Sequence, residues 1–220
     1  MSMPTTQRAT SSTTGRADPR HRTGRSPRDG ASGPAPRATP APPSPAPPAR
    51  AGAIVQLIGS FQGGGAQRLA LNLAEALAGR GSRVLAVALR HAGAFTQLDT
   101  PQGVEVCALN ASRERGVSVL RAAWALRRLL RSCGASVVHV HGSGCVVVAA
   151  LAMLGWRGRP RLVFTWHDSG SVLGGRGLAT RLTRWALRRC DALYGSSKSV
   201  ADRLHEALGP RHPVGVLVNG

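Results

Sequence analysis

The chain has 220 residues, of which 42% are hydrophobic, so it is long enough to bury the core of one domain. Its formal net charge of +19, from 29 Lys and Arg against 10 Asp and Glu, favours anionic partners such as phosphorylated substrates or acidic membranes. Aromatic residues make up only 4% and no basic-plus-aromatic recognition module is present, so specific nucleic-acid binding is not expected.

The first fifty residues differ in composition from the rest of the chain. Residues 1–50 hold most of the 15 prolines and almost no Val, Ile, Leu or aromatic residue. Such a segment buries too little apolar surface to offset its ordering entropy, so we expect a disordered basic tail rich in Pro, Ala, Ser and Thr. It lacks the apolar core of about 7–15 residues that a secretory signal has. One folded domain is therefore expected over residues 51–220.

Strand and helix patterns alternate through this domain. In chain order we predict a strand at 53–59, a helix over 66–81, strands at 83–89 and 104–109, a helix over 117–133, a strand at 137–141, a helix over 145–155, a strand at 161–167, a helix over 178–190, a strand from 191, a helix over 199–208 and a strand at 214–218. In the 117–133 helix, Val117, Leu120 and Trp124 form the apolar stripe opposite the arginines. The alternation predicts an α/β fold, a Rossmann-like doubly wound parallel sheet with helices on both faces.

Polar residues and glycines interrupt this pattern where strands end. They are Gly63, Gly64 and Gly65, His141, His167 with Asp168, Ser196 with Ser197, and Asn219. In doubly wound sheets the ligands bind at the carboxyl ends of the strands. The sequence therefore predicts a binding site built from these residues.

The segment GGGAQR, residues 63–68, joins the first predicted strand to the first helix. The open N–H groups of a helix start suit a phosphate or pyrophosphate, which glycine lets approach closely. A tight connection that needs positive φ explains the glycines equally well, and the sequence leaves both explanations open. A dinucleotide fingerprint would need glycine where Arg68 stands and an acid where Arg90 ends the second strand. With the GxxxxGK[ST] loop also absent, neither NAD nor ATP is favoured.

The cysteines and histidines give no metal-binding pattern. The four cysteines contain no CxxC pair, which is typical of thiols in a reducing compartment, so we expect a cytoplasmic protein. His139 and His141 share one face of a strand, but no third ligand is evident beside them. The longest apolar run, residues 145–156, is too short to span a bilayer and is typical of a buried helix.

Five segments in series resemble one known family. GGGAQRLALNLAEALAGRGSRVLAVAL, VVHVHG, FTWHDSG, DALYGSSKSVADRL and VLVNG are similar in order and spacing to the N-terminal domain of family 4 glycosyltransferases, retaining enzymes of the GT-B fold, over residues 53–220. The resemblance implies one half of a GT-B fold on the acceptor side of a cleft. It also implies transfer of a hexose from a nucleotide-sugar to a sugar, lipid or other acceptor, with the nucleotide-sugar as co-substrate and no cofactor or metal.

The resemblance also assigns roles to the residues at the strand ends. His167 would lie against the transferring sugar, and Asp168 would orient it or bind a hydroxyl. The binding residues are Gly63, Gly64 and Gly65 at the donor diphosphate, Gln67 and Arg68 at the acceptor or phosphate, Ser196 and Ser197 at a strand end, and Asn219 at the crossing into a second domain.

Structural explanations compete with several of these roles. His167 could simply cap a strand, and Ser196 could be the N-cap of the following helix. The 178–190 helix sets Leu178, Leu182 and Trp185 beside arginines. This pattern suits peripheral contact with an anionic membrane at its inner face, or a pocket for a lipid-phosphate acceptor, or only a solvated arginine face.

The family's second Rossmann-like domain, which holds most of the nucleotide-sugar and carries an E-x7-E motif, has no counterpart in residues 1–220. Without that opposite wall, water is not excluded from a bound diphosphate and half a cleft is not expected to turn over alone. Three hypotheses follow: the acceptor half of a glycosyltransferase that meets a donor-binding half, in a truncated reading frame or on a separate chain; a non-catalytic module that binds a phosphorylated or lipid-linked sugar; or an inactive remnant.

Overall fold

The computed structural model describes residues 52–61, 64–90, 101–111, 117–167 and 175–217. Within them the strands are β1 (Ala53–Ile58), β2 (Val84–Ala88), β3 (Val104–Ala108), β4 (Ala135–His141), β5 (Arg161–Trp166), β6 (Ala192–Gly195) and β7 (Gly215–Val216). The helices are α1 (Gly65–Ala78), α2 (Val117–Ser132), α3 (Ser143–Ala152), α4 (Leu178–Leu187) and α5 (Lys198–Leu208). Every predicted element is present, with its ends shifted by a few residues at most.

The strands form one parallel sheet with the order β3-β2-β1-β4-β5-β6-β7. From β1 the chain moves outward to β2 and β3, then returns across the sheet so that β4 pairs with the other side of β1. This reversal between β1 and β4 is the switch point at which doubly wound sheets bind their ligands. The predicted Rossmann-like α/β fold is confirmed.

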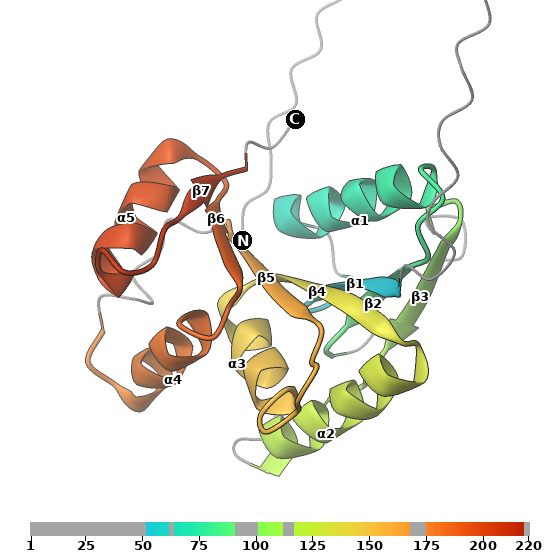
Figure 1. Ribbon diagram of the computed structural model, residues 1–220, viewed down its shortest axis with the longest axis horizontal. Helices are drawn as coiled ribbons and strands as arrows, with labels where there is room; N and C mark the ends of the chain where they lie inside the picture. Colours follow the sequence, from blue (N-terminus) through green and yellow to red (C-terminus); the bar gives the residue numbers. More distant parts are fainter. Residues whose placement is uncertain (1–51, 62–63, 91–100, 112–116, 168–174, 218–220) are drawn as a thin grey trace, which may run out of the picture. The chain divides into compact units, whose positions relative to one another are not determined.

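Two apolar clusters cover the two faces of the sheet. Alternate residues of a strand point to opposite faces, and β1 shows this directly: Val55 and Leu57 belong to the larger cluster, Ile54 and Ile58 to the smaller one. Residues of α2, α3, α4 and α5 complete the larger cluster, whereas α1 supplies the helical part of the smaller one. Figure 1 shows α1 on one side of the central strands and α2 and α3 on the other.

The apolar stripe predicted for α2 does not face the core. Leu120 and Trp124 are 65% and 60% exposed, while the buried positions of α2 are Ala122, Ala123, Leu126 and Leu130. The helix carries two apolar stripes, and the one rich in alanine packs on the sheet because small side chains let the helix approach it closely. Leu120 and Trp124 therefore lie on the outer face of α2.

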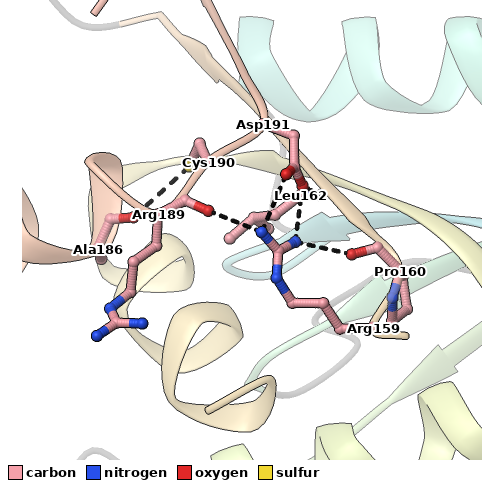
Figure 2. Close-up of polar contacts among 7 residues, drawn as sticks. All are labelled: Arg159, Pro160, Leu162, Ala186, Arg189, Cys190 and Asp191. Atoms are coloured by element: carbon pink, nitrogen blue, oxygen red, sulfur yellow. Dashed lines mark hydrogen bonds and ion pairs between the residues drawn. The ribbon is translucent and has the colours of Figure 1, made fainter. Parts of the chain in front are cut away.

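A charged contact joins the amino-terminal ends of β5 and β6 and the residues that follow α4 (Figure 2). The Arg159 guanidinium donates to both carboxylate oxygens of Asp191, at 2.7 and 3.0 Å, and the Leu162 N–H donates to the same carboxylate at 2.6 Å. Burial raises the pKa of Asp191, but the hydrogen bonds from Arg159 and Leu162 outweigh it and hold that pKa below its ordinary value. The carboxylate is therefore stabilised in its ionised form.

We expect Asp191→Asn to lower the free energy of unfolding by about 1–2 kcal/mol at pH 7, because it removes charge-assisted bonds at a partly exposed site. Denaturant unfolding monitored by circular dichroism measures the change. Glu105→Gln is the matched control, since Glu105 forms a similar two-point contact with Arg83 at the surface. Equal losses in the two variants would show that the Leu162 bond and the partial burial of Asp191 add nothing.

Candidate functional site

A cavity of about 490 Å³ lies at the carboxyl ends of the strands, at the switch point. Gly59 lines it after β1, Arg90 after β2, His141 at the end of β4 and His167 after β5. Apolar side chains form much of its wall: Leu89, Val119, Val148, Phe164 and Trp166. The cavity therefore combines an apolar wall with a few polar groups, as small-molecule sites do.

Hydrogen bonds connect the histidines at these strand ends in two sets. His141 Nδ1 lies 3.0 Å from His167 Nε2, and His141 Nε2 lies 2.8 Å from Gln56 Oε1. His139 instead pairs with Thr165, its Nε2 lying 2.8 Å from the hydroxyl oxygen. All five residues lie on neighbouring strands or directly after one, and the register pairs Gln56 with His139 and His141 with Thr165. The parallel sheet therefore brings together residues from 56 to 167.

Burial keeps these histidines neutral. It lowers the pKa of His139 to about 4, with a smaller contribution from the nearby His167, and it lowers the pKa of His141 well below its ordinary value. The pKa of His167 is also lowered by burial. Because neutral imidazole carries one N–H and one lone pair, each ring has one donor and one acceptor at pH 7.

The glycine turn leads into α1 without a side-chain cap. Gly64 is the N-cap, with extended backbone at φ −177°, and no side chain bonds to the first N–H groups of the helix. A Cβ on Gly64 would meet only the tip of the Gln67 side chain, and one on Gly65 would meet nothing within 4 Å. Positive φ is therefore not what calls for glycine at 64 and 65. The open N–H groups of this helix start remain available to an anion.

The cavity takes in some of the predicted site residues and not others. Gln67 and His167 line it, whereas Gly64, Gly65, Arg68, Ser196 and Ser197 do not. Ser197 is the N-cap of α5, its Oγ accepting from the Val200 N–H at 3.3 Å. The capping role suggested for Ser196 is thus wrong by one residue; Ser196 instead donates its N–H to the Trp166 carbonyl at the end of β5. Gly63, Asp168 and Asn219 lie outside the described residues.

Two polar residues near the cavity had not been predicted as site residues. Gln56 is fully buried in β1 and bonds to His141, and its signal in the sequence was a single amide within an apolar strand. Arg90 follows β2 and donates from Nε to the Gly59 carbonyl at 3.4 Å. Its charge lies beside the cavity where a dinucleotide-binding domain would have an acid.

The described residues contain no group of three or more His, Cys, Asp or Glu side chains placed to hold a metal ion. The Cys145 thiol lines the cavity, but burial raises its pKa to about 12, so it stays protonated. A thiol is a poor nucleophile in that state. In the part of the chain that the structure describes, no helix has the length and apolar character needed to cross a bilayer.

Solved structures with a similar fold include a sucrose-phosphate synthase, MurG and a glycosyltransferase. A sucrose-phosphate synthase from Thermosynechococcus elongatus matches with 14% identity and a TM-score of 0.63 over 77% of this chain and 48% of that chain. MurG from Acinetobacter baumannii matches with 16% identity and a TM-score of 0.53, over 76% of this chain and 46% of that chain. A glycosyltransferase from Rickettsia africae matches with 14% identity and a TM-score of 0.55, over 76% of this chain and 43% of that chain. At such identities the likeness shows the fold alone. The matched region is less than half of each of those chains.

No curated protein matches the sequence. The model of glycosyltransferase family 4, however, matches residues 63–220, which is most of the chain and includes the glycine turn, the histidine strands and the end of the sheet. Together with the parallel sheet order and the cavity at its switch point, this match identifies the domain. The chain belongs to glycosyltransferase family 4.

Proposed function

We propose that the chain is the acceptor-side half of a retaining glycosyltransferase that moves a hexose from a nucleotide-sugar to a sugar, lipid or other acceptor. The observation that carries the proposal is the cavity at the switch point, where Gln67 from the glycine turn's helix and His167 after β5 line one space. In the proposed complex His167 contacts the transferring sugar. Asp168 assists it, and the remaining binding residues are those that the family resemblance assigns.

The conformation of the glycine turn supports the diphosphate role. At Gly64 and Gly65 the backbone needs no positive φ, and a Cβ would meet nothing or only a flexible side chain. Glycine is therefore not required there by the described fold, but it leaves room for a ligand to reach the N–H groups. A diphosphate uses such room, because its oxygens must come within hydrogen-bond distance of the backbone.

A donor-binding half is also part of the proposal. Leaving-group charge on a diphosphate needs fixed donors in a site that excludes water, and we propose that the described residues form one wall of that site. We place the second wall on a further domain, encoded either beyond residue 220 or by another chain. Transfer is proposed to need no metal, with cationic side chains of the donor-binding half stabilising the leaving group.

The test is to mix the chain with a family 4 donor-binding domain and to measure nucleoside diphosphate release from nucleotide-sugars in the presence of acceptors. We expect release only with both polypeptides, and a loss of about 100-fold in His167→Ala, because misplacing the sugar costs about that factor. Gly65→Ala should also lower release while raising the unfolding free energy by up to about 1 kcal/mol, the helix-propensity gain. The anomeric configuration of the product, followed by NMR, tests retention.

Gly177→Ala is the control for the glycine variant, since a Cβ at the N-cap of α4 also meets nothing within 4 Å but lies away from the cavity. Reconstituted activity that survives His167→Ala would show that the site is assigned wrongly. Nucleotide-sugar binding by the chain alone, with no transfer after any donor-binding domain is added, would favour the binding module instead.

We also propose that the chain contacts an anionic membrane surface through α4 and residues 188–190. Leu178 and Leu182 are 73% and 40% exposed, and the Arg189 guanidinium lies over the Trp185 ring at 4.6 Å. The exposed stripe of α2 repeats this arrangement, with Arg128 over Trp124 at 4.8 Å. Helices α2, α3 and α4 contain no Asp or Glu at all. Exposed Leu and Trp side chains among positive charges suit the interface of an anionic bilayer.

We expect vesicles containing phosphatidylglycerol to retain the chain at low salt and to release it as salt rises, whereas neutral vesicles should not retain it. Flotation measures the bound fraction. Leu178→Ser with Leu182→Ser, and Leu120→Ser with Trp124→Ser, should each weaken retention; Leu217→Ser, at an exposed apolar residue after β7, is the control. If both double variants float like the wild type, the arginines of residues 1–50 or other basic residues bind the vesicles and this surface is wrong.

A further inference from the structure

Hydrogen bonds link Gln56, His141 and His167 in series across the neighbouring strands β1, β4 and β5. The links are Gln56 Oε1 to His141 Nε2 at 2.8 Å and His141 Nδ1 to His167 Nε2 at 3.0 Å. We propose that Gln56 and His141 are positioning residues that fix the proton of His167 on Nε2, so that His167 meets the sugar as a hydrogen-bond acceptor. The inference rests on the proposed function, because it concerns how His167 meets its substrate.

The direction of each bond follows from the first one. An amide oxygen carries no proton, so His141 must donate from Nε2 to Gln56. Burial keeps His141 neutral, and its only proton is then used on Nε2. Its Nδ1 therefore accepts, and His167 must donate from Nε2. The buried Gln56 amide thus determines the tautomer of His167, to which it is connected by two successive hydrogen bonds through His141.

The terminal nitrogen atoms of this hydrogen-bonded series lack partners among the described residues. His167 Nδ1 and Gln56 Nε2 are buried and have no hydrogen-bond partner among the described residues. A buried acceptor without a partner is costly, and a hydroxyl that donates to His167 Nδ1 would remove the cost. Sugar hydroxyls can donate, whereas an ionised phosphate oxygen cannot. His167 is thereby matched to a hydroxyl of the sugar and mismatched to the diphosphate, which is left to the glycine turn.

The opposite arrangement is well defined and makes the inference testable. If Gln56 presented its amide nitrogen to His141, each histidine would carry its proton on Nδ1 instead of Nε2. His167 would then donate from Nδ1. It would then suit a phosphate oxygen. The structure places Oε1, not the amide nitrogen, beside His141.

Side-chain ¹⁵N NMR of the full chain at pH 7 decides between the two arrangements, because protonated and unprotonated ring nitrogens have separate shifts. We expect His167 with its proton on Nε2 in the wild type. In Gln56→Leu the preference for a proton on Nε2 should fall by about tenfold, which is the effect of one lost hydrogen bond. Thr165→Val is the control, since Thr165 bonds to His139, in the second set.

A wild-type proton on His167 Nδ1, or a tautomer unchanged in Gln56→Leu, would overturn the proposal. If Gln56→Leu does not fold, the wild-type spectrum decides the assignment alone. The measurement needs no substrate, so its failure is separate from that of the transfer assay. A protonated Nε2 combined with full activity in His167→Ala would leave the tautomer assignment standing and show that His167 is assigned wrongly to the sugar.

Activity of the reconstituted enzyme tests the hydroxyl partner. With a panel of deoxy donor and acceptor sugars, one deoxy analogue should lose as much activity as His167→Ala loses with the full sugar. The two changes together should cost no more than either one, because they remove the same bond. Additive losses for every analogue would exclude a hydroxyl partner for His167.

Discussion

Gly195→Ala is expected to lower the free energy of unfolding by about 2–3 kcal/mol, near the upper end for overpacking a core. Gly195 is the buried last residue of β6, and it pairs with Trp166 on one side and Val216 on the other. A Cβ there would meet the backbone N of Ala201 and lie 2.6 Å from its Cα and 2.9 Å from its Cβ. These atoms belong to α5 rather than to a flexible side chain, so the helix must move away from the strand.

Denaturant unfolding compared with Gly144→Ala measures the effect. Gly144 lies inside α3, where a Cβ meets nothing within 4 Å, so alanine should leave stability unchanged or raise it by up to about 1 kcal/mol. The two variants add the same methyl group, and only its surroundings differ. Equal stability of the Gly195 and Gly144 variants would mean that α5 does not pack against β6 as closely as the structure has it.

The order of elements was predictable because each strand is a short apolar run and each helix begins soon after it. The predicted boundaries were accurate to within a few residues because glycines mark them. Gly81 and Gly134, both with positive φ, lie just after the ends of α1 and α2. The face that a helix buries was not reliable. In α2 the alanines pack and Trp124 is exposed, and the choice between two stripes depends on how close the sheet lies, which no local pattern contains.

The candidate site was predictable where it depends on topology and not where it depends on register. Parallel strands end on one edge, so His141 and His167 could be placed together from the sequence. Gln56 could not be, because its contact with His141 requires β1 and β4 to pair in one particular register, far apart in the chain. Arg90 was noticed only as a missing acid, although its side chain lies beside the cavity.

Stability is expected to fall as the pH drops from 7 towards 4, because the folded chain holds His139 and His141 neutral. The folded-state pKa of His139 is about 4 against an ordinary 6.5, and that of His141 is lowered well below it. Below pH 6.5 the unfolded chain therefore binds more protons than the folded chain. The contribution to stability is complete above pH 6.5 and is lost as the pH falls from 6.5 towards 4. For His139 alone the loss is about 2 kcal/mol at pH 5 and on the order of 3 kcal/mol at pH 4.

Unfolding free energies measured between pH 7 and 4 test this, with His139→Gln as the informative variant. Glutamine still offers Thr165 a polar partner but cannot titrate. The slope of the unfolding free energy against pH, between pH 6 and 4.5, should therefore fall by the equivalent of about one proton, whatever the substitution does to stability at pH 7. Asp191 acts in a separate window, because its lowered pKa means that its contribution is lost only at more acid pH. A wild-type curve that is flat from pH 7 to 5 would contradict the neutral histidines. It would also remove the basis for the His141 proton assignment, since a charged ring would donate from both nitrogens.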